Sequence, residues 1–390
     1  MIGEIRVSLD ALRHNARTLR ELVTPAKCAF VVKSNAYGHG LIDTALAIEP
    51  FADYVCVYGL EEALALRDGG ITAPILVMGP IPLDALGDAF AAKVEIALWD
   101  TGSYARTAAS TARKYGGAFP VHAKLNTGVA RLGIEAQDAP DAIEDFLRIP
   151  DLRIAGIFSH LASAEELDSP FTLTQLDRFT KALAPIEPLL QERNIAPVRH
   201  IAASAAAMLW PQTRLDMVRI GIALYGLWPS AQTQQALGEQ AITLQPALEF
   251  ISTLCVIRDV AVGMPVGYGS TYHAPRTMRI GVVPLGYADG VPRALSNRGA
   301  FVVDGARCPI VGRVCMNMTM IDLTAAPNAA VGITVSLIGG PGSVRVSAED
   351  WALWADTINY EIVARLPSEI PRSYFGEDEP IEKLVRAPQR

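Results

Sequence analysis

One lysine closes a strongly apolar run near the start of the chain. The segment VVKSNAYGHG, residues 31–40, places Lys33 directly after a run that is typical of a buried strand. In a parallel barrel, functional groups lie at the carboxyl ends of the strands, where an amine is partly removed from water. Desolvation lowers the pKa of a lysine and frees its amine for Schiff-base chemistry. A lysine whose stem merely reaches solvent is the commoner case, so Lys33 alone leaves both interpretations open.

Polar groups also follow two apolar runs near residues 200 and 220. Ser204 follows one run, and Arg219, Gly221 and Ile222 close the other. Barrel enzymes commonly build phosphate sites from the loops after their last two strands, and unobstructed backbone N–H groups bind anions there. Ordinary strand-to-helix turns contain glycine as well. Arg219 is harder to explain as a turn residue, because a guanidinium buried at a strand end needs partners.

Three glycine-rich motifs in the last third of the chain carry further candidate residues. Tyr268 lies in VGYGSTY, Tyr287 lies in LGYADGVPR, and Met316 lies in VGRVCMNM. Tyrosines flanked by glycine are expected at exposed loop tips that reach a ligand or a partner. Hairpin turns with packing aromatic rings explain either tyrosine equally well on its own.

The remaining composition excludes several classes of protein. The six histidines include no pair at metal-ligand spacing, so we expect no metal site, and no serine-hydrolase, zinc-protease or P-loop motif is present. A net charge of -7 lacks the basic footprint of a nucleic-acid binder. The five cysteines have no CxxC spacing, which favours reduced thiols in the cytoplasm. The N-terminal residues contain no apolar run and predict no signal peptide. The longest uncharged stretch, 323–344, is interrupted by proline and glycine and predicts no membrane span, so we expect a cytoplasmic protein.

The elements that position these residues change in type near residue 235. Up to about residue 230, apolar runs alternate with amphipathic stretches such as 9–22, 42–48 and 175–193, which indicates βαβ units and a parallel sheet. Eight runs predict an N-terminal (β/α)8 TIM barrel, with a doubly wound sheet as the alternative. The runs are 28–33, 54–59, 73–79, 94–99, 119–126, 152–160, 198–203 and 216–226.

The second part of the chain is expected to be mostly β. After the polar stretch 230–240, short strand-like runs are separated by glycine, proline and asparagine, and the next helical pattern covers 348–366. We therefore expect an α/β protein with a barrel domain at residues 8–236 and a C-terminal β domain at 237–390. Residues 1–7 are expected to pair with the β domain.

Together these motifs resemble the alanine racemases, which are pyridoxal-phosphate enzymes with a barrel and a C-terminal β domain. VVKSNAYGHG is similar to the family's cofactor-lysine signature, and the resemblance covers essentially the whole chain. Six further strings occur in family order: KLNTGVARLG, MVRIGIALYG, GYGSTY, GYADG, GRVCM and TINYEI. Seven such strings in one order make coincidence a poor explanation. The resemblance implies an isomerase that interconverts L-alanine and D-alanine and supplies D-alanine for peptidoglycan or returns it to catabolism.

The resemblance also implies roles for individual residues. Lys33 would carry pyridoxal 5'-phosphate as a Schiff base and act as one acid/base, and Tyr268 from the partner of a homodimer would act as the other. Arg219 would face the pyridine nitrogen, supported by His200, and His160 would lie beside the ring. The phosphate would be held by Tyr37, Ser204, Gly221, Ile222 and Tyr360.

Substrate contacts and one modification follow from the same resemblance. Arg131 would bind the cofactor's phenolic oxygen and the substrate carboxylate. The Met316 backbone N–H and the Tyr287 hydroxyl, both from the partner, would help to hold the substrate. Lys124 matches a lysine that is carbamylated in many members, where the new carboxylate fixes the neighbouring arginine.

Several positions depart from the family pattern. Asn126, Val129 and Ala130 change the segment between Lys124 and Arg131, and Ala203 replaces a frequent asparagine before Ser204. Asn317 replaces a frequent aspartate after Met316, which removes a negative charge beside the expected substrate site.

Three alternatives remain beside the leading interpretation. A broad-specificity amino-acid racemase of the same fold is one, and a fold-related pyridoxal-phosphate amino-acid decarboxylase is another. The Arg219 motif and the strings around Tyr268 and Met316 favour racemisation over decarboxylation. A non-catalytic pyridoxal-phosphate carrier would resemble the barrel alone, so the motifs of the second domain argue against it.

Overall fold

The computed structural model describes residues 2–238 and 242–376. Residues 239–241 lie just after the expected domain boundary at 236/237, and residues 377–390 end the expected β domain. Both segments, like Met1, fall outside the described residues. Contacts divide the chain into two units. We call residues 12–36 and 41–245 the barrel unit, and the described parts of 1–11, 37–40 and 246–390 the β unit.

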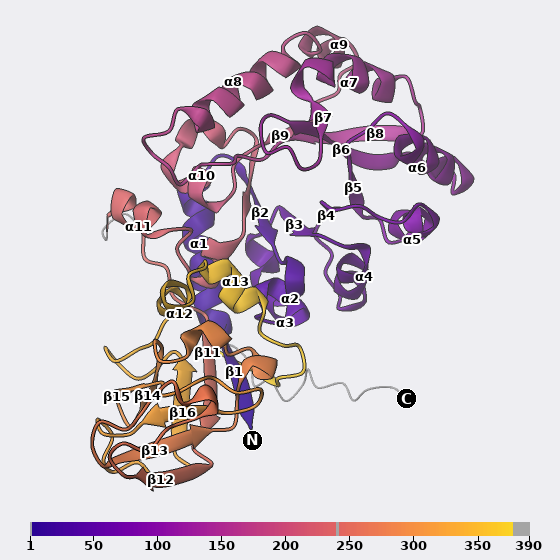
Figure 1. Ribbon diagram of the computed structural model, residues 1–390. Coiled ribbons are helices and arrows are strands. Elements are labelled where there is room, and N and C mark those ends of the chain that lie inside the picture. The colour runs from indigo at the N-terminus through magenta and orange to yellow at the C-terminus, as the bar shows by residue number, and fades with distance from the viewer. Residues whose placement is uncertain (1, 239–241, 377–390) are drawn as a thin grey trace. The chain divides into compact units, whose positions relative to one another are not determined.

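Eight parallel strands form the sheet of the barrel unit, as the sequence predicts. Their order follows the chain and the sheet is almost closed into a ring, with helices outside the strands (Figure 1). The strands are β2 (Lys27–Val31), β3 (Tyr54–Val57), β4 (Ile75–Val77), β5 (Glu95–Leu98), β6 (Phe119–Asn126), β8 (Leu152–Phe158), β9 (Val198–His200) and β10 (Met217–Ile220). A two-residue strand, β7 (Ile134–Glu135), pairs with β6 and was not expected from the sequence.

The two ends of the sheet, β9 and β10, meet through a single bridge. Ala203 and Arg219 form a parallel bridge, and the Arg219 N–H donates to the Ala202 carbonyl at 3.0 Å. On the other side, β10 pairs with β2 from Met217–Lys27 to Ile220–Phe30. The carboxyl ends of β2, β9 and β10 therefore lie at the same end of the ring, where the sequence places Lys33, Ser204 and Gly221.

The helices follow from the amphipathic stretches between the strands. Most strand residues are buried, which explains why the runs are apolar throughout instead of alternating. The stretch 175–193 becomes two helices, because Pro188 begins the second one. The α-helices assigned to this part of the chain are α1 (Leu9–Val23), α2 (Lys33–Tyr37), α3 (Leu41–Ile48), α4 (Leu60–Asp68), α5 (Leu86–Ala91), α6 (Ser103–Lys114), α7 (Ala139–Leu147), α8 (Phe171–Leu183), α9 (Glu187–Glu192), α10 (Ser204–Leu209) and α11 (Ala231–Leu237).

The β unit consists of a six-stranded and a three-stranded sheet with two helices. The larger sheet has the order β15-β14-β17-β11-β1-β18, and the smaller has the order β12-β13-β16. Strand β1 pairs antiparallel with β11 and parallel with β18. The elements are β1 (Gly3–Ser8), β11 (Leu248–Thr253), β12 (Val256–Val260), β13 (Met278–Val283), β14 (Ala300–Val303), β15 (Ala306–Pro309), β16 (Thr319–Asp322), β17 (Thr334–Ile338), β18 (Arg372–Phe375), α12 (Ala348–Ala355) and α13 (Asn359–Ala364).

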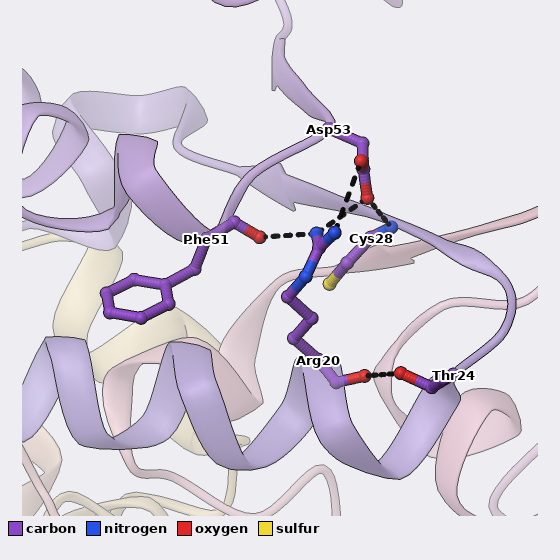
Figure 2. A network of polar contacts seen from close by, with 5 residues as sticks. All are labelled: Arg20, Thr24, Cys28, Phe51 and Asp53. Atoms are coloured by element: carbon purple, nitrogen blue, oxygen red, sulfur yellow. Dashed lines mark hydrogen bonds and ion pairs between the residues drawn. The ribbon is translucent and has the colours of Figure 1, made fainter.

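One ion pair fixes the start of the strand that leads to Lys33. Arg20 on α1 donates to Asp53 Oδ2 at 2.7 Å and to the Phe51 carbonyl at 2.9 Å (Figure 2). The same Asp53 oxygen accepts the buried Cys28 N–H at 2.8 Å. Asp53 thus ties α1 to the beginnings of β2 and β3. Among the described residues, no helix is long and apolar enough to cross a membrane.

We expect Asp53→Ala to destabilise the barrel unit. The change leaves the Cys28 N–H buried without its acceptor and removes the partner of Arg20, which costs about 1–3 kcal/mol of the free energy of unfolding. Thermal unfolding followed by circular dichroism measures the loss. The exposed Asp84→Ala is the matched control, and an equal midpoint for both variants would contradict this account.

Candidate active site

The backbone after strand β2 turns in the left-handed direction at Lys33. Ser34, Asn35 and Ala36 have φ of 55°, 54° and 53°, and Tyr37 continues at 52°. Left-handed geometry costs a residue with a Cβ roughly 1–2 kcal/mol, and such strain clusters at functional sites. Asn35 helps to hold the turn, because its Oδ1 accepts the Leu41 N–H at 2.9 Å. The turn places the Lys33 amine at the carboxyl end of β2.

Four basic side chains gather around the carboxyl ends of the barrel strands. Burial lowers the pKa of Lys33, and the charge of Arg131 lowers it further while Glu62 opposes the shift. Burial and the charges of Arg131, Arg219 and Lys33 lower the pKa of Lys124 to about 8. Such a concentration of positive charge suits an anionic ligand that carries several negative groups.

The Arg219 guanidinium is buried at the centre of this group. Burial lowers its pKa to about 10, so the group stays charged near neutral pH. It donates to His200 Nδ1 at 2.7 Å and to the Ser159 carbonyl at 2.8 Å. A longer contact joins it to His160 Nδ1 at 3.3 Å. The ring of Phe158 lies beneath both Arg219 and Lys124, 5.3 and 5.4 Å from their charged ends.

The two histidines beside Arg219 are neutral. Burial, then the charge of Arg219, then those of Arg131, Lys124 and Lys33 lower the pKa of His160 to about 3. Burial and Arg219 likewise hold the pKa of His200 well below its usual value. Because an arginine can only donate, it must donate to Nδ1 of each ring. The Nε2–H of His160 is therefore available as a donor.

The expected phosphate residues of the barrel unit lie together. The Gly221 N–H donates to Ser204 Oγ at 3.0 Å, and Ile222 follows directly in the chain. Ser204 begins α10, and Gly221 follows β10. Lys124 and Arg131 line one pocket with Asn126, Val129, Ser159 and His160. The sequence-predicted residues of this unit are thus gathered at the ends of β2, β6, β8, β9 and β10.

The β unit brings its own predicted residues together in two places. The rings of Tyr37 and Tyr360 lie 6.3 Å apart between their centroids. Elsewhere, the Tyr287 N–H donates to the Cys315 carbonyl and the following Ala288 N–H donates to the Met316 carbonyl, each at 2.9 Å. The loops of Tyr287 and Met316 are therefore joined side by side. A Cβ at Gly286 would lie 2.2 Å from the Cys315 oxygen, so only glycine permits this approach.

Tyr268 lies on a third loop that packs against the same segment. A Cβ on the neighbouring Gly269 would meet the guanidinium of Arg313 at 3.2 Å. Tyr268, Met316 and Tyr287 are 73%, 56% and 44% exposed in the single chain. The three glycine-rich motifs thus converge and present their side chains outward.

Two polar residues near Arg219 were missed by the sequence analysis. His122 lies in β6 and contacts His200, and Glu95 begins β5 and contacts His122. The signal in the sequence was a charged or imidazole side chain inside an apolar strand run, a position that requires a buried partner.

Comparison with known proteins agrees with this architecture. Residues 7–229 match the family described as "Alanine racemase, N-terminal domain", and residues 247–374 match "Alanine racemase, C-terminal domain". A protein of Desulfosudis oleivorans named alanine racemase is 38% identical over 94% of this chain and 95% of its own length. Another, from Desulforamulus reducens, is 37% identical over 95% of this chain and 98% of its own.

Solved structures show the same relation. The alanine racemase from Streptomyces lavendulae has a TM-score of 0.89 at 33% identity, over 97% of this chain and 98% of that one. The Bacillus anthracis alanine racemase with bound L-Ala-P has a TM-score of 0.87 at 32% identity, over 97% and 96%. The two-unit α/β fold and these matches define an enzyme of the isomerase class. The chain belongs to the alanine racemase family and is an isomerase.

We expect the Lys124 amine to titrate near pH 8 in the cofactor-free protein. Arg131→Ala removes a like charge, so it raises this pKa, whereas Arg148→Ala at the C-terminal cap of helix α7 leaves it unchanged. Reductive methylation with labelled formaldehyde, followed by carbon NMR against pH, measures it. A titration at the ordinary lysine value in the unaltered protein would refute the electrostatic account.

Proposed function

We propose that the chain interconverts L-alanine and D-alanine with pyridoxal 5'-phosphate as its cofactor. The observation that carries this proposal is the Lys33 amine after β2, whose pKa is lowered by burial and by the charge of Arg131. A neutral amine is the form that attacks a carbonyl carbon. The names of the relatives and the order of the shared motifs support alanine as the substrate.

The donor set of the barrel unit fits this cofactor. Lys33 would bind it covalently, Arg219 would face its ring nitrogen with His200 behind, and His160 would lie beside the ring. Arg131 would bind its phenolic oxygen and the substrate carboxylate. We assign its phosphate to Ser204, Gly221 and Ile222 of the barrel unit, and the family resemblance alone adds Tyr37 and Tyr360 of the β unit. When bound, pyridoxal phosphate supplies an electron sink that acidifies the substrate's Cα–H bond.

Two groups on opposite faces of Cα would move the proton. The Lys33 amine takes or returns it on one face, and the Tyr268 hydroxyl does so on the other. A free tyrosine has a pKa of ~10, so Tyr268 needs positive neighbours to act as a base near neutral pH. Arg219 and the donor Nε2–H of His160 supply that field in this proposal.

We propose a homodimer in which Tyr268, Tyr287 and Met316 serve the partner's barrel. Their exposure in the single chain supports this arrangement, because large apolar and aromatic side chains on converging loops are typical of an interface. In this arrangement the Tyr287 hydroxyl and the Met316 N–H help to hold the substrate. The pairing of their two loops would fix the distance between those groups.

Lys124 is proposed to be carbamylated. A pKa of about 8 leaves part of its amine neutral at physiological pH, and the neutral amine adds to carbon dioxide with release of one proton. The carbamate carries a negative charge, which the positive charges of Arg131, Arg219 and Lys33 stabilise. The same charges repel the cationic amine and do not stabilise the neutral one. Labelled bicarbonate added during the Lys124 titration would reveal the carbamate carbon.

We place the enzyme in the cytoplasm, as a source of D-alanine for peptidoglycan or a route for its catabolism. The cysteines at 28, 56, 255, 308 and 315 are free thiols, which fits a reducing compartment. We also propose residues 8–236 as the cofactor-binding domain and 237–390 as the β domain. A broad-specificity racemase and an amino-acid decarboxylase are the alternatives that the following assays distinguish.

We expect Lys33→Ala to abolish the visible absorbance of bound cofactor and all racemisation, because the covalent attachment is lost. Lys27→Ala, at the exposed start of the same strand, keeps both. The assays are an absorbance spectrum and the appearance of D-alanine from L-alanine. A cofactor band without D-alanine would favour racemisation of another amino acid or decarboxylation. No band after reconstitution with pyridoxal 5'-phosphate would contradict binding of that cofactor.

We expect Tyr268→Phe to lower the racemisation rate by about 10²–10⁴-fold, because one of the two proton-transfer groups is gone. Tyr272→Phe in the same motif is the control. Mixing Lys33→Ala chains with Tyr268→Phe chains should restore about a quarter of the wild-type rate, since half the dimers gain one intact site. No recovery on mixing would contradict donation of Tyr268 across the dimer.

A further inference from the structure

A chain of buried polar side chains leads from Arg219 across the interior of the barrel. Arg219 Nη1 contacts His200 Nδ1 at 2.7 Å, and His200 Nε2 contacts His122 Nδ1 at 2.8 Å. His122 Nε2 then contacts Glu95 Oε2 at 2.7 Å. The four residues lie on β10, β9, β6 and β5, and all four are buried. No role for Glu95 or His122 follows from the proposed function.

Only one arrangement of protons satisfies all three contacts. An arginine can only donate, so His200 Nδ1 accepts and its single proton is on Nε2. His122 Nδ1 must then accept this proton's hydrogen bond, which leaves its own proton on Nε2, pointing at Glu95. A carboxylate only accepts, so the chain ends there. Both imidazoles are neutral and carry the proton on Nε2.

An additional proton breaks the chain. If His122 were an imidazolium, its Nδ1–H would donate to His200 Nε2, and the one proton of His200 would move to Nδ1. That proton would face the Arg219 N–H, donor against donor. The contact between His122 and Glu95 is therefore a neutral imidazole donating to a carboxylate, although its atoms are close enough for an ion pair.

Glu95 is held as an anion. Burial raises its pKa, whereas the hydrogen bond from His122, then the charge of Arg153 and the hydrogen bond from Tyr54, lower it and favour the ionised carboxylate. Arg153 lies 3.6 Å from the second carboxylate oxygen, and Glu95 lines a surface cleft with Arg67 and Lys93. The carboxylate thus ends the buried chain where it meets the surface.

The packing is shaped to hold the two imidazoles. A Cβ at Gly156 would lie 2.2 Å from His122 Nδ1, so glycine leaves the space that this ring occupies. The Phe158 ring stacks on His200 at 4.8 Å between centroids with an interplanar angle of 1°. Each ring is fixed in orientation, and the hydrogen-bond direction is then set at the two ends of the chain.

We propose that Glu95 is a positioning residue for the racemase reaction: it gives the His122 Nε2–H its acceptor and so stabilises the Nε2–H tautomers of His122 and His200 that the Arg219 end requires. Through them it keeps His200 Nδ1 an acceptor that aims the Arg219 guanidinium. The effect on catalysis rests on the proposed place of Arg219 at the cofactor's ring nitrogen. The tautomers themselves do not depend on that assignment. Without the carboxylate, the buried His122 Nε2–H has no acceptor, so only the Arg219 end still orders the hydrogen bonds and the Nδ1–H tautomer of His122 becomes more populated.

The test is nitrogen NMR of the holoenzyme with labelled histidine. His122→Gln and His200→Gln assign the two rings by loss of their signals. In the wild-type protein we expect both rings to be neutral with the proton on Nε2. Glu95→Ala should shift His122 to the Nδ1–H tautomer or to a mixture. Glu95→Gln should restore the original tautomers, because its amide oxygen still accepts from Nε2–H.

Catalysis should follow the tautomers. We expect Glu95→Ala to lower kcat/KM by about 10- to 100-fold through the misplaced guanidinium, and Glu95→Gln to recover most of the loss. Glu49→Ala removes another carboxylate of the barrel unit, which accepts the Thr72 N–H at 2.7 Å. It should cost stability but change neither tautomer.

Two results would overturn the proposal. One is a His122 imidazolium or Nδ1–H tautomer in the wild-type protein. This measurement does not require the Glu95→Ala variant to fold. The other is a folded Glu95→Ala variant with unchanged tautomers and wild-type kcat/KM. Wild-type tautomers as expected in a protein that binds no cofactor would instead contradict the proposed function and leave the structural part intact.

Discussion

The buried Arg219 guanidinium is the constraint on which the barrel site depends. A charged group without water must be surrounded by acceptors, since an unpaired one costs several kcal/mol. Arg219 finds His200 Nδ1 and the carbonyls of Ser159, His200 and Ile201. These acceptors come from the ends of β8 and β9. The backbone of the same residue bridges Ala203 and closes the barrel. The same residue therefore joins the ends of the barrel sheet through its backbone and places a buried guanidinium in the site through its side chain.

The left-handed turn after β2 also helps to position the positive charge of the site, because it orients Lys33. Four consecutive left-handed residues are unfavourable on their own, and the strain is offset by the contacts of Asn35 and the packing of Ala36, which is fully buried. A right-handed turn would begin a normal helix from Lys33 and carry the amine along a different direction. The strained turn and the buried guanidinium together hold the basic groups of Lys33, Lys124 and Arg219 near one another, although like charges repel. Such preorganisation favours a polyanionic ligand.

The sequence predicts the barrel well because its information is local. Runs that are apolar on both faces identify strands, and the eight predicted runs coincide with β2, β3, β4, β5, β6, β8, β9 and β10. Lys33 and Arg219 stand out because charged residues at the ends of such runs violate the pattern. Element ends are less predictable: the run that contains residues 248–257 breaks at Leu254 into β11 and β12.

The missed features share one physical property, which is dependence on remote partners. His122 and Glu95 are 27 residues apart, and His200 is a further 78 residues from His122. No periodicity links such positions, because their contacts exist only once the four strands β5, β6, β8 and β9 lie side by side. The left-handed turn is also hidden, since Ser34 and Ala36 have no preference for that geometry. The family resemblance names the residues expected around the cofactor and His200 behind Arg219, and it is silent about His122 and Glu95.

Two departures from the family pattern, Asn126 and Asn317, form hydrogen bonds that an aspartate could form only in part. Asn126 Oδ1 accepts the N–H groups of Gly128 and Ala130, as an aspartate would, but its amide also donates to Glu135 at 2.8 Å. In the β unit, the Asn317 amide donates to Asp289 at 3.2 Å. An aspartate at either position would place two carboxylates in contact and raise the pKa of one of them. Each amide keeps the loop geometry and removes one negative charge. Each amide therefore contacts an acidic neighbour through a hydrogen bond that two ionised carboxylates could not form.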